Sequence, residues 1–161
     1  MKKSNIGQME CSLARALAQV GDPWTLLIMK EIVLGNRRFD GIHKQTGMSS
    51  LSLSSRLSAL ETARIIRRSP YSQRPPRFEY LATAKGKSLW PLLVALTQWG
   101  DQWTGNGGVP LKIWHKGCTH GGHPTVCCSG CGEPMAARDA TMLMSRRMKK
   151  DREARGNLRA R

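Results

Sequence analysis

One stretch decides the fold of this chain: residues 39–63, FDGIHKQTGMSSLSLSSRLSALETA. The pattern predicts two short helices, Phe39–Thr46 and about Ser50–Ala63. Gly47 turns the chain between them, and Ser49 is placed to cap the second helix. Two short helices joined by a glycine-containing turn are the sequence pattern of a helix-turn-helix.

The second of these helices has two different faces. One is an apolar stripe at the i, i+4, i+7 spacing, formed by Leu53, Leu57 and Leu60. The opposite face is small, mostly hydroxylated and free of acids; it consists of Leu51, Ser54, Ser55, Ser58 and Thr62. A helix fits the major groove when its outward face is neither bulky nor acidic, and serine hydroxyls can bond base edges and phosphates. The pattern therefore predicts a DNA recognition helix.

Two more helices are expected upstream of this stretch. Glu10–Val20 is short and amphipathic, and Gly21 ends it. Asp22 has the form of an N-cap and Pro23 suits a first helical position, so Trp24–Leu34 should be the second helix.

Downstream, two short β-like segments are expected at Ile65–Arg68 and Arg77–Leu81. The polar, proline-rich Ser69–Pro76 between them reads as an exposed hairpin loop. Thr83 should cap a fifth helix that runs to about Trp103. Its apolar stripe comprises Leu89, Leu92, Leu93, Leu96, Trp99 and Trp103. A hairpin directly after a helix-turn-helix predicts a winged helix: a mainly α fold with a small β-hairpin wing (α+β), ending in a dimerisation helix and a small cysteine-rich extension.

The charge of the chain indicates a polyanionic partner. The 161 residues carry a formal net charge of +15. Residues 36–77 hold nine basic and two acidic residues, and residues 141–161 hold eight basic and two acidic residues. Residues 106–140 between them are nearly neutral. The tail could form a short basic helix up to Arg155, frayed after Gly156; it either adds phosphate or membrane-surface contacts or is a solvated terminus with no specific role.

Basic residues flank the predicted recognition helix and lie on the predicted wing, where they could neutralise phosphates. The full set of expected DNA-contacting residues is Arg37, Arg38, Lys44, Ser49, Ser50, Leu51, Ser54, Ser55, Arg56, Arg74 and Arg77. Two alternatives stay open at this point. One is a three-helix scaffold with a solvated basic face, and the other is a nucleic-acid-binding protein without sequence preference, whose binding would fall steeply with salt on any sequence.

The residues also resemble a known family. The stretch CSLARALAQVGDPWTLLIMKEIVLGNRRFDGI, residues 11–42, is similar to the opening of HxlR-type transcriptional regulators. The similarity continues through residues 48–66, through SPYSQRPPRFEYLATAKG (69–86) and through WGDQW (99–103). It implies a winged helix-turn-helix repressor or activator that binds double-stranded DNA. It also implies a homodimer formed through terminal helices, here about residues 10–20 and 84–103.

One position departs from the family pattern. The usual glycine after the recognition helix is replaced by Arg64. A left-handed cap would cost a non-glycine residue on the order of 1 kcal/mol. We therefore expect this helix to end differently and the angle of the wing to change.

The five cysteines, Cys11, Cys118, Cys127, Cys128 and Cys131, are an odd number in a chain with an intracellular character, which argues against a disulfide framework. Cys11 stands at a helix start, a position that favours the reactive thiolate. The family resemblance implies a redox or electrophile sensor there. A small, half-buried packing residue is the alternative.

The other cysteines lie in residues 118–134, CTHGGHPTVCCSGCGEP. A CxxCG knuckle at Cys128 and Cys131, with a Cys/His pair upstream, offers tetrahedral S₃N ligation to one structural zinc ion. Longer HxlR-type chains carry a similar extension, which selects the set Cys118, His120, Cys128 and Cys131, with His123 and Cys127 as alternates. An ordered loop of free thiols is the competing interpretation.

We expect that the protein is not an enzyme. The CxxC has no surrounding βαβ pattern, no convincing general base accompanies the cysteine cluster, and neither a phosphate loop nor a dinucleotide fingerprint is present. Three regions are expected: 1–105 for DNA binding and dimerisation, 106–140 for the cysteine- and histidine-rich extension, and 141–161 for the basic tail. With no membrane-spanning stretch or signal segment, we expect a cytoplasmic protein with no membrane partner. The operator and any small-molecule or redox inducer cannot be read from these residues.

Overall fold

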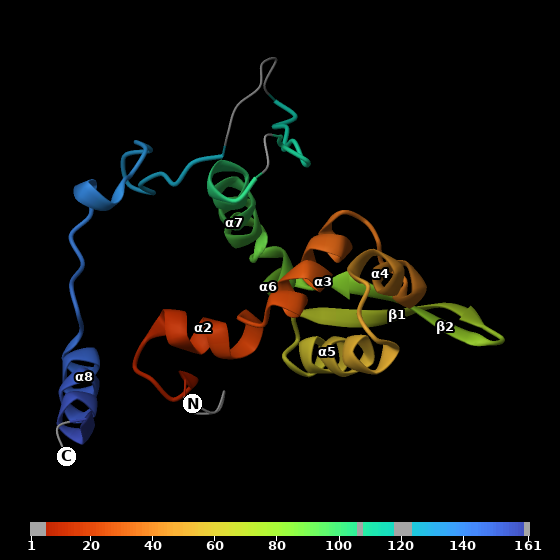
Figure 1. Cartoon of the computed structure of the whole chain (residues 1–161), viewed down its shortest axis with the longest axis horizontal. Coiled ribbons are helices and arrows are strands. Elements are labelled where there is room, and N and C mark those ends of the chain that lie inside the picture. The colour runs from red at the N-terminus through yellow and green to blue at the C-terminus, as the bar shows by residue number, and fades with distance from the viewer. Residues whose placement is uncertain (1–5, 106–107, 118–123, 160–161) are drawn as a thin grey trace. The chain divides into compact units, whose positions relative to one another are not determined.

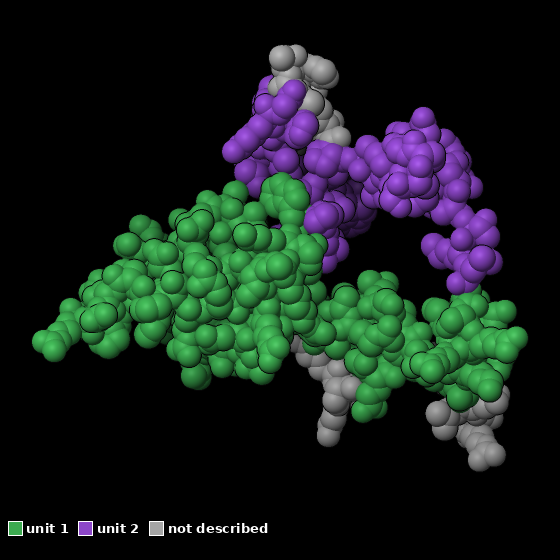
Figure 2. All heavy atoms as spheres, turned by 180° about the vertical axis from the view of Figure 1, so that it is seen from behind, with its two compact units in different colours: residues 1–90, 144–161 green, residues 91–143 purple. Residues whose placement is uncertain are grey.

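The computed structural model describes residues 6–105, 108–117 and 124–159, and its elements are labelled in Figure 1. The chain divides into two compact units, residues 1–90 with 144–161 and residues 91–143, which Figure 2 colours separately. Unit 1 contains α2 (Ser12–Val20), α3 (Pro23–Val33), α4 (Phe39–Thr46), α5 (Ser50–Thr62), β1 (Ile66–Gln73), β2 (Pro76–Ala82), α6 (Ala84–Lys87) and α8 (Arg146–Arg159). Most of α7 (Trp90–Trp103) belongs to unit 2. Within the described residues, the helices are too short or too polar to traverse a lipid bilayer.

The expected helix boundaries in the first half of the chain are confirmed within one or two residues, because local caps define them. The Asp22 carboxylate accepts the Thr25 amide at 3.1 Å, and the Ser49 hydroxyl accepts the Ser52 amide at 3.2 Å. Gly47 ends α4 in the left-handed region, with φ 67°. The helix-turn-helix therefore forms over the residues that the sequence indicated.

The apolar stripe of α5 faces the core of unit 1. Its three leucines are buried together with residues of α3, α4 and β1; the set includes Ile28, Met29, Ile32, Ile42, Leu53, Leu57, Leu60, Ile65 and Ile66. Burying one such side chain contributes about 1.5–3 kcal/mol relative to leaving it exposed. The same burial turns the opposite, hydroxylated face of α5 outward.

The wing is a two-stranded antiparallel sheet, as expected, but its strands are longer than the sequence indicated. Pairing runs from Ile66 opposite Ala82 to Gln73 opposite Pro76. The expectation of a loop over Ser69–Pro76 is therefore wrong, since only Arg74 and Pro75 lie between the strands. Each strand of a two-stranded sheet keeps one free edge, where a proline without an N–H group is tolerated.

The expected single fifth helix is also wrong, because the chain forms α6 and α7 with a break at Ser88 and Leu89. Pro91 has no N–H group to bond the carbonyl four residues earlier, so a continuous helix is interrupted there. Pro91 is tolerated in the first turn of α7. The basic tail differs as well: α8 continues through Gly156 to Arg159 rather than fraying.

The end of α5 contradicts the expectation for Arg64. Arg64 adopts the left-handed conformation itself, with φ 56°, and the Ile65 amide bonds the Leu60 carbonyl at 2.9 Å. The Thr83 hydroxyl donates to the Arg64 carbonyl at 2.7 Å and helps to hold this conformation. The helix α5 therefore ends in a left-handed turn although the residue there is arginine and not glycine, and β1 begins two residues later.

Replacing Arg64 with glycine should raise the free energy of unfolding by about 1 kcal/mol, because glycine adopts φ 56° without a steric penalty. Urea denaturation at a fixed protein concentration measures this change. Arg67→Gly, in a strand of ordinary conformation, is the matched control and should lower stability. A destabilising effect of both variants would contradict the cost assigned to Arg64.

Candidate nucleic-acid interface

The outward face of α5 is open to solvent. Leu51 is 82% exposed, and the side chains of Ser54, Ser55, Ser58 and Thr62 are exposed as well. The one acid of this helix, Glu61, is half-buried and bonds Arg68 at 2.9 Å, so it does not belong to this face. The face is therefore hydroxylated and uncharged, and it lies opposite the leucines of α5 that are buried in the core.

The start of α5 is tied to α4 through a histidine that sequence reasoning missed. The His43 Nε2 atom lies 3.3 Å from the Ser50 hydroxyl. The His43 ring also stacks on Phe39, with the ring centroids 6.1 Å apart. The Phe39–His43 spacing is a helical i, i+4 pair that the sequence could have indicated. The contact with Ser50 depends on the turn between the two helices.

Arg56 of α5 is paired with an acid at the N-cap of α3, a contact that the sequence did not indicate. Its Nε and Nη2 atoms donate to Asp22 at 2.9 and 3.1 Å, a bidentate pair that joins α5 to the N-cap of α3. The hydrogen bond to Asp22 raises the pKa of Arg56. Because Asp22 already compensates this guanidinium charge, we leave Arg56 out of the proposed phosphate contacts and assign it a bracing role.

The loop before α4 carries Arg37 and Arg38 and is held by a buried acid, also missed from the sequence. Glu31 is 6% exposed and bonds Lys30 Nζ at 2.7 Å and Asn36 Nδ2 at 3.2 Å. The Arg37 carbonyl accepts the Tyr80 amide at 2.8 Å, so this loop is anchored to β2. Both arginine side chains are exposed.

Arginines contact the wing from two places. Arg38, from the loop before α4, lies over the Tyr71 ring at 4.5 Å, and Arg68 of β1 lies over Phe78 at 5.5 Å. At the tip of the wing, Arg74 and Arg77 are exposed, and the hairpin extends past the helices of unit 1 (Figure 1). The ring contacts hold Arg38 and Arg68 against the hairpin, and the exposed side chains of Arg38, Arg74 and Arg77 are positioned to contact a polyanion.

The remaining predicted positions are also placed on the surface. Lys44 is exposed in the last turn of α4, and Ser49 is exposed although its hydroxyl caps α5. Lys44, Ser50, Ser54 and Arg74 are thus all carried by unit 1. Their contact with DNA stays a prediction.

Cys11 lies at the N-cap of α2, where the sequence placed it. Its backbone is extended, its side chain is half-buried, and its thiol is free. The thiol makes no hydrogen bond as a cap. This position is compatible with either interpretation of Cys11 given above, sensor or packing residue.

The cysteine-rich segment forms a tight knuckle in unit 2. The Cys128 amide donates to the Glu133 carbonyl at 2.9 Å, and the Gly132 amide donates to the Cys128 carbonyl at 2.8 Å. Gly132 has φ 79°, which favours glycine. Backbone hydrogen bonds from Cys131 and Gly130 lower the pKa of Cys128. The turn therefore stabilises a thiolate at Cys128.

The predicted ligand set is only partly visible. Cys118, His120 and His123 lie outside the described residues. Cys127 and Cys131 are exposed and Cys128 is half-buried, all as free thiols. In the described ranges, no three His, Cys, Asp or Glu side chains come together as a metal site. The structure thus provides half of the predicted set.

Comparison with known proteins gives a consistent result. Residues 19–107 match the model of the HxlR-like helix-turn-helix family. The chain is 40% identical, over 81% of its length and 83% of the relative's, to the HTH-type transcriptional regulator Mb3122 of Mycobacterium bovis. The solved structure of PA1607, a candidate transcription factor, superposes with a TM-score of 0.76 at 28% identity, covering 88% of this chain and 99% of that one. The oxidised form of the redox regulator HypR superposes with a TM-score of 0.54 at 27% identity, covering 57% and 96%.

Proposed function

Because this chain belongs to the HxlR-like helix-turn-helix family of transcription regulators, we propose that it recognises a specific operator in double-stranded DNA as a homodimer. One observation carries the proposal: the exposed, hydroxylated, acid-free face of α5 lies on the same unit as a wing with two arginines at its tip. Whether the protein represses or activates depends on where the operator lies relative to a promoter.

In this proposal α5 enters the major groove with the side chains of Ser50, Leu51, Ser54 and Ser55 nearest the bases. Serine hydroxyls bond base edges, and Leu51 contacts a thymine methyl group. Arg37, Arg38, Lys44, Arg74 and Arg77 neutralise phosphates, the wing pair from the minor groove side.

The dimer is proposed from exposed apolar side chains on the two terminal helices. Leu13 of α2 is 68% exposed, and Trp99 and Trp103 of α7 are 59% and 67% exposed. Exposed large apolar side chains on a helix mark an interaction surface, and for each of these two helices we propose a second copy of the chain as the partner. Sedimentation of the full chain at micromolar concentration tests this, and a monomer under those conditions would refute the dimer.

Selection of duplex fragments from random or genomic DNA tests the proposed function as a whole. We expect enrichment of one motif with two related half-sites, because a two-fold symmetric dimer presents α5 twice. Retention of that binding in excess competitor DNA separates operator recognition from the alternative of nonspecific nucleic-acid binding. Enrichment of no motif would reject the proposal.

A second proposal concerns zinc. We propose that Cys128 and Cys131, with Cys118 and His120, hold one structural zinc ion per chain, a role that the knuckle and its thiolate-stabilising amides favour. A zinc site would supply the stability that a segment with few buried apolar side chains lacks.

Protein purified without chelator should contain about one zinc per chain by elemental analysis, because four ligands complete a tetrahedral site. Cys128→Ser and Cys131→Ser should lose the metal, since each removes one thiolate. Cys127→Ser is the matched control and should retain it. A zinc content well below one per chain in the parent protein would reject the site. Loss of zinc from Cys127→Ser would show that the alternate Cys127 is one of the ligands.

Redox control of the same regulator is a further candidate, favoured by the similarity to HypR, which is described as a redox regulator. Cys11 at the start of α2 and the knuckle thiols are the groups that could respond. Operator binding measured before and after peroxide or quinone treatment tests this. An unchanged response in Cys11→Ser would exclude Cys11 as the sensor.

A further inference from the structure

The C-terminal helix α8 is strongly basic and exposes its charge. Arg146–Arg159 contains seven basic and two acidic residues. The cationic side chains of Arg146, Arg147, Lys149, Lys150 and Arg152 are all exposed. The half-buried side chains described in this helix are Met148, Asp151 and Arg155.

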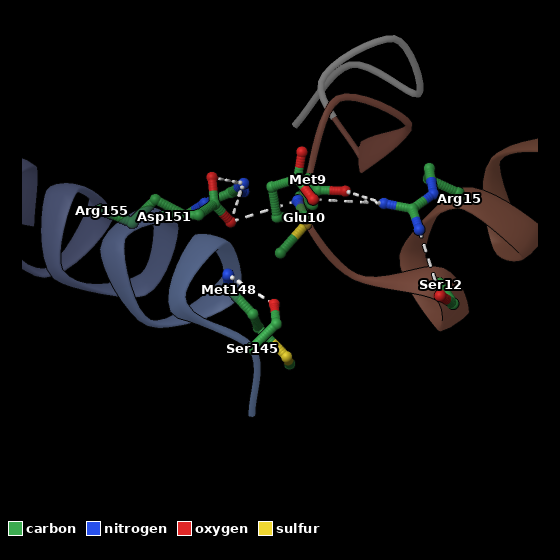
Figure 3. Close-up of polar contacts among 8 residues, drawn as sticks. All are labelled: Met9, Glu10, Ser12, Arg15, Ser145, Met148, Asp151 and Arg155. Carbon is green, nitrogen blue, oxygen red and sulfur yellow. Dashed lines mark hydrogen bonds and ion pairs between the residues drawn. The ribbon is translucent and has the colours of Figure 1, made fainter. Parts of the chain in front are cut away.

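The half-buried side of α8 is turned toward the start of the chain. The Glu10 amide donates to Asp151 Oδ2 at 3.3 Å, and Figure 3 shows Met9 and Glu10 opposite Asp151. Arg155 Nη2 lies 2.6 Å from both carboxylate oxygens of Asp151. The side-chain hydrogen bond from Arg155 lowers the pKa of Asp151. The contact attaches α8 to the unit that carries α5 and the wing.

The exposed charges of α8 disfavour the helix on its own. An isolated helix of 14 residues is marginal in water. Arg146 and Arg147 place positive charge at the helix N-terminus, where the dipole favours negative charge. Arg146 and Lys150, four residues apart, repel each other along one face. An extended polyanion along this face would remove both penalties.

We propose that α8 is a second DNA-contacting element, which lies along duplex phosphates and adds affinity that does not depend on sequence. The proposal rests on the proposed operator binding. Duplex DNA is favoured over a membrane surface because an interfacial helix needs a broad apolar face. The half-buried side of α8 instead contains the Asp151–Arg155 ion pair and is occupied by residues 9–10.

The test compares the full-length protein with the variant Arg146→Gln, Arg147→Gln, Lys149→Gln and Lys150→Gln on the selected operator across a salt series. Each lost phosphate contact reduces the slope of log affinity against log salt by about 0.9, so the four substitutions should make the slope shallower by about 3.6 per subunit, or about 7 for the dimer. Affinity near 0.1 M salt should fall by about tenfold or more, equally on operator and unrelated duplex.

Two controls calibrate this measurement. Arg74→Ala removes one proposed phosphate contact from each wing and should reduce the slope by about 0.9 per subunit, or about 1.8 for the dimer. Glu153→Gln removes an exposed acid from α8 and should strengthen binding slightly rather than weaken it.

If the salt slope is unchanged in the fourfold variant while Arg74→Ala still reduces it, α8 does not contact the duplex. This outcome would overturn the role of α8 without affecting the proposal of operator binding. The same result together with loss of binding to vesicles rich in anionic phospholipid would assign the helix to a membrane surface instead. Failure of the parent protein to select any operator would reject the proposed function itself, which the fragment selection detects separately.

Discussion

Replacing Ser54 with glutamate is expected to reduce operator affinity by on the order of 100-fold or more without unfolding the protein. Ser54 is exposed on the outward face of α5, so the substitution fills no packed space. In the proposed complex, however, the new carboxylate would face DNA phosphates, and an unfavourable like-charge pair in an interface costs several kcal/mol. A dimer carries the substitution in both half-sites. Fluorescence anisotropy on the selected operator measures the loss, and thermal denaturation shows whether the fold is kept.

Two further variants are the controls for this experiment. Ser54→Ala removes the hydroxyl without adding charge and should weaken binding by about tenfold, the effect of one lost hydrogen bond. Ala137→Glu adds the same charge at an exposed position of unit 2, outside α5, the wing and the helices proposed for the dimer, and should bind normally. Wild-type operator affinity in Ser54→Glu would contradict the proposed placement of α5 in the major groove.

Replacing Gly86 with alanine should lower the free energy of unfolding by about 3 kcal/mol. Gly86 is buried in α6, and a Cβ atom there would overlap the carbonyl oxygen of Ile65 and lie 3.2 Å from its carbon. The same carbonyl accepts the Thr83 amide at 3.0 Å, and the Thr83 hydroxyl that donates to Arg64 lies 3.0 Å from it. Because backbone atoms rather than a flexible side chain occupy the space, the junction between β1 and α6 must shift. Urea denaturation at a fixed protein concentration measures the change.

Gly156→Ala is the matched control for this substitution. Apart from the backbone of α8 and the two neighbouring residues, no described atom lies within 4 Å of a Cβ built at Gly156, and the residue is inside α8. Alanine is favoured over glycine in a helix by about 1 kcal/mol, so this variant should be neutral or slightly stabilising. Equal effects of the two substitutions would show that Gly86 is not required by close packing.

The sequence alone determined the elements whose causes lie within a few residues. The caps at Asp22, Ser49 and Thr83, the turn at Gly47 and the leucine stripe of α5 all depend on contacts between neighbours along the chain. Caps and helical periodicity act over one or two turns, so they can be recognised without knowledge of the fold. The outward face of the recognition helix follows directly, since it is opposite the stripe that the core buries.

Only the tertiary structure decided how the arginines are used and where the wing strands end. Arg56 forms an ion pair with Asp22, 34 residues away in the sequence. Arg38, which precedes the helix-turn-helix in the sequence, lies over the ring of Tyr71, which follows it. Which acid or ring lies beside a cation depends on the packing of distant elements, and strand length depends on a partner strand. Arg64 keeps a left-handed turn because Thr83 and the wing hold its backbone, a constraint that no local pattern contains.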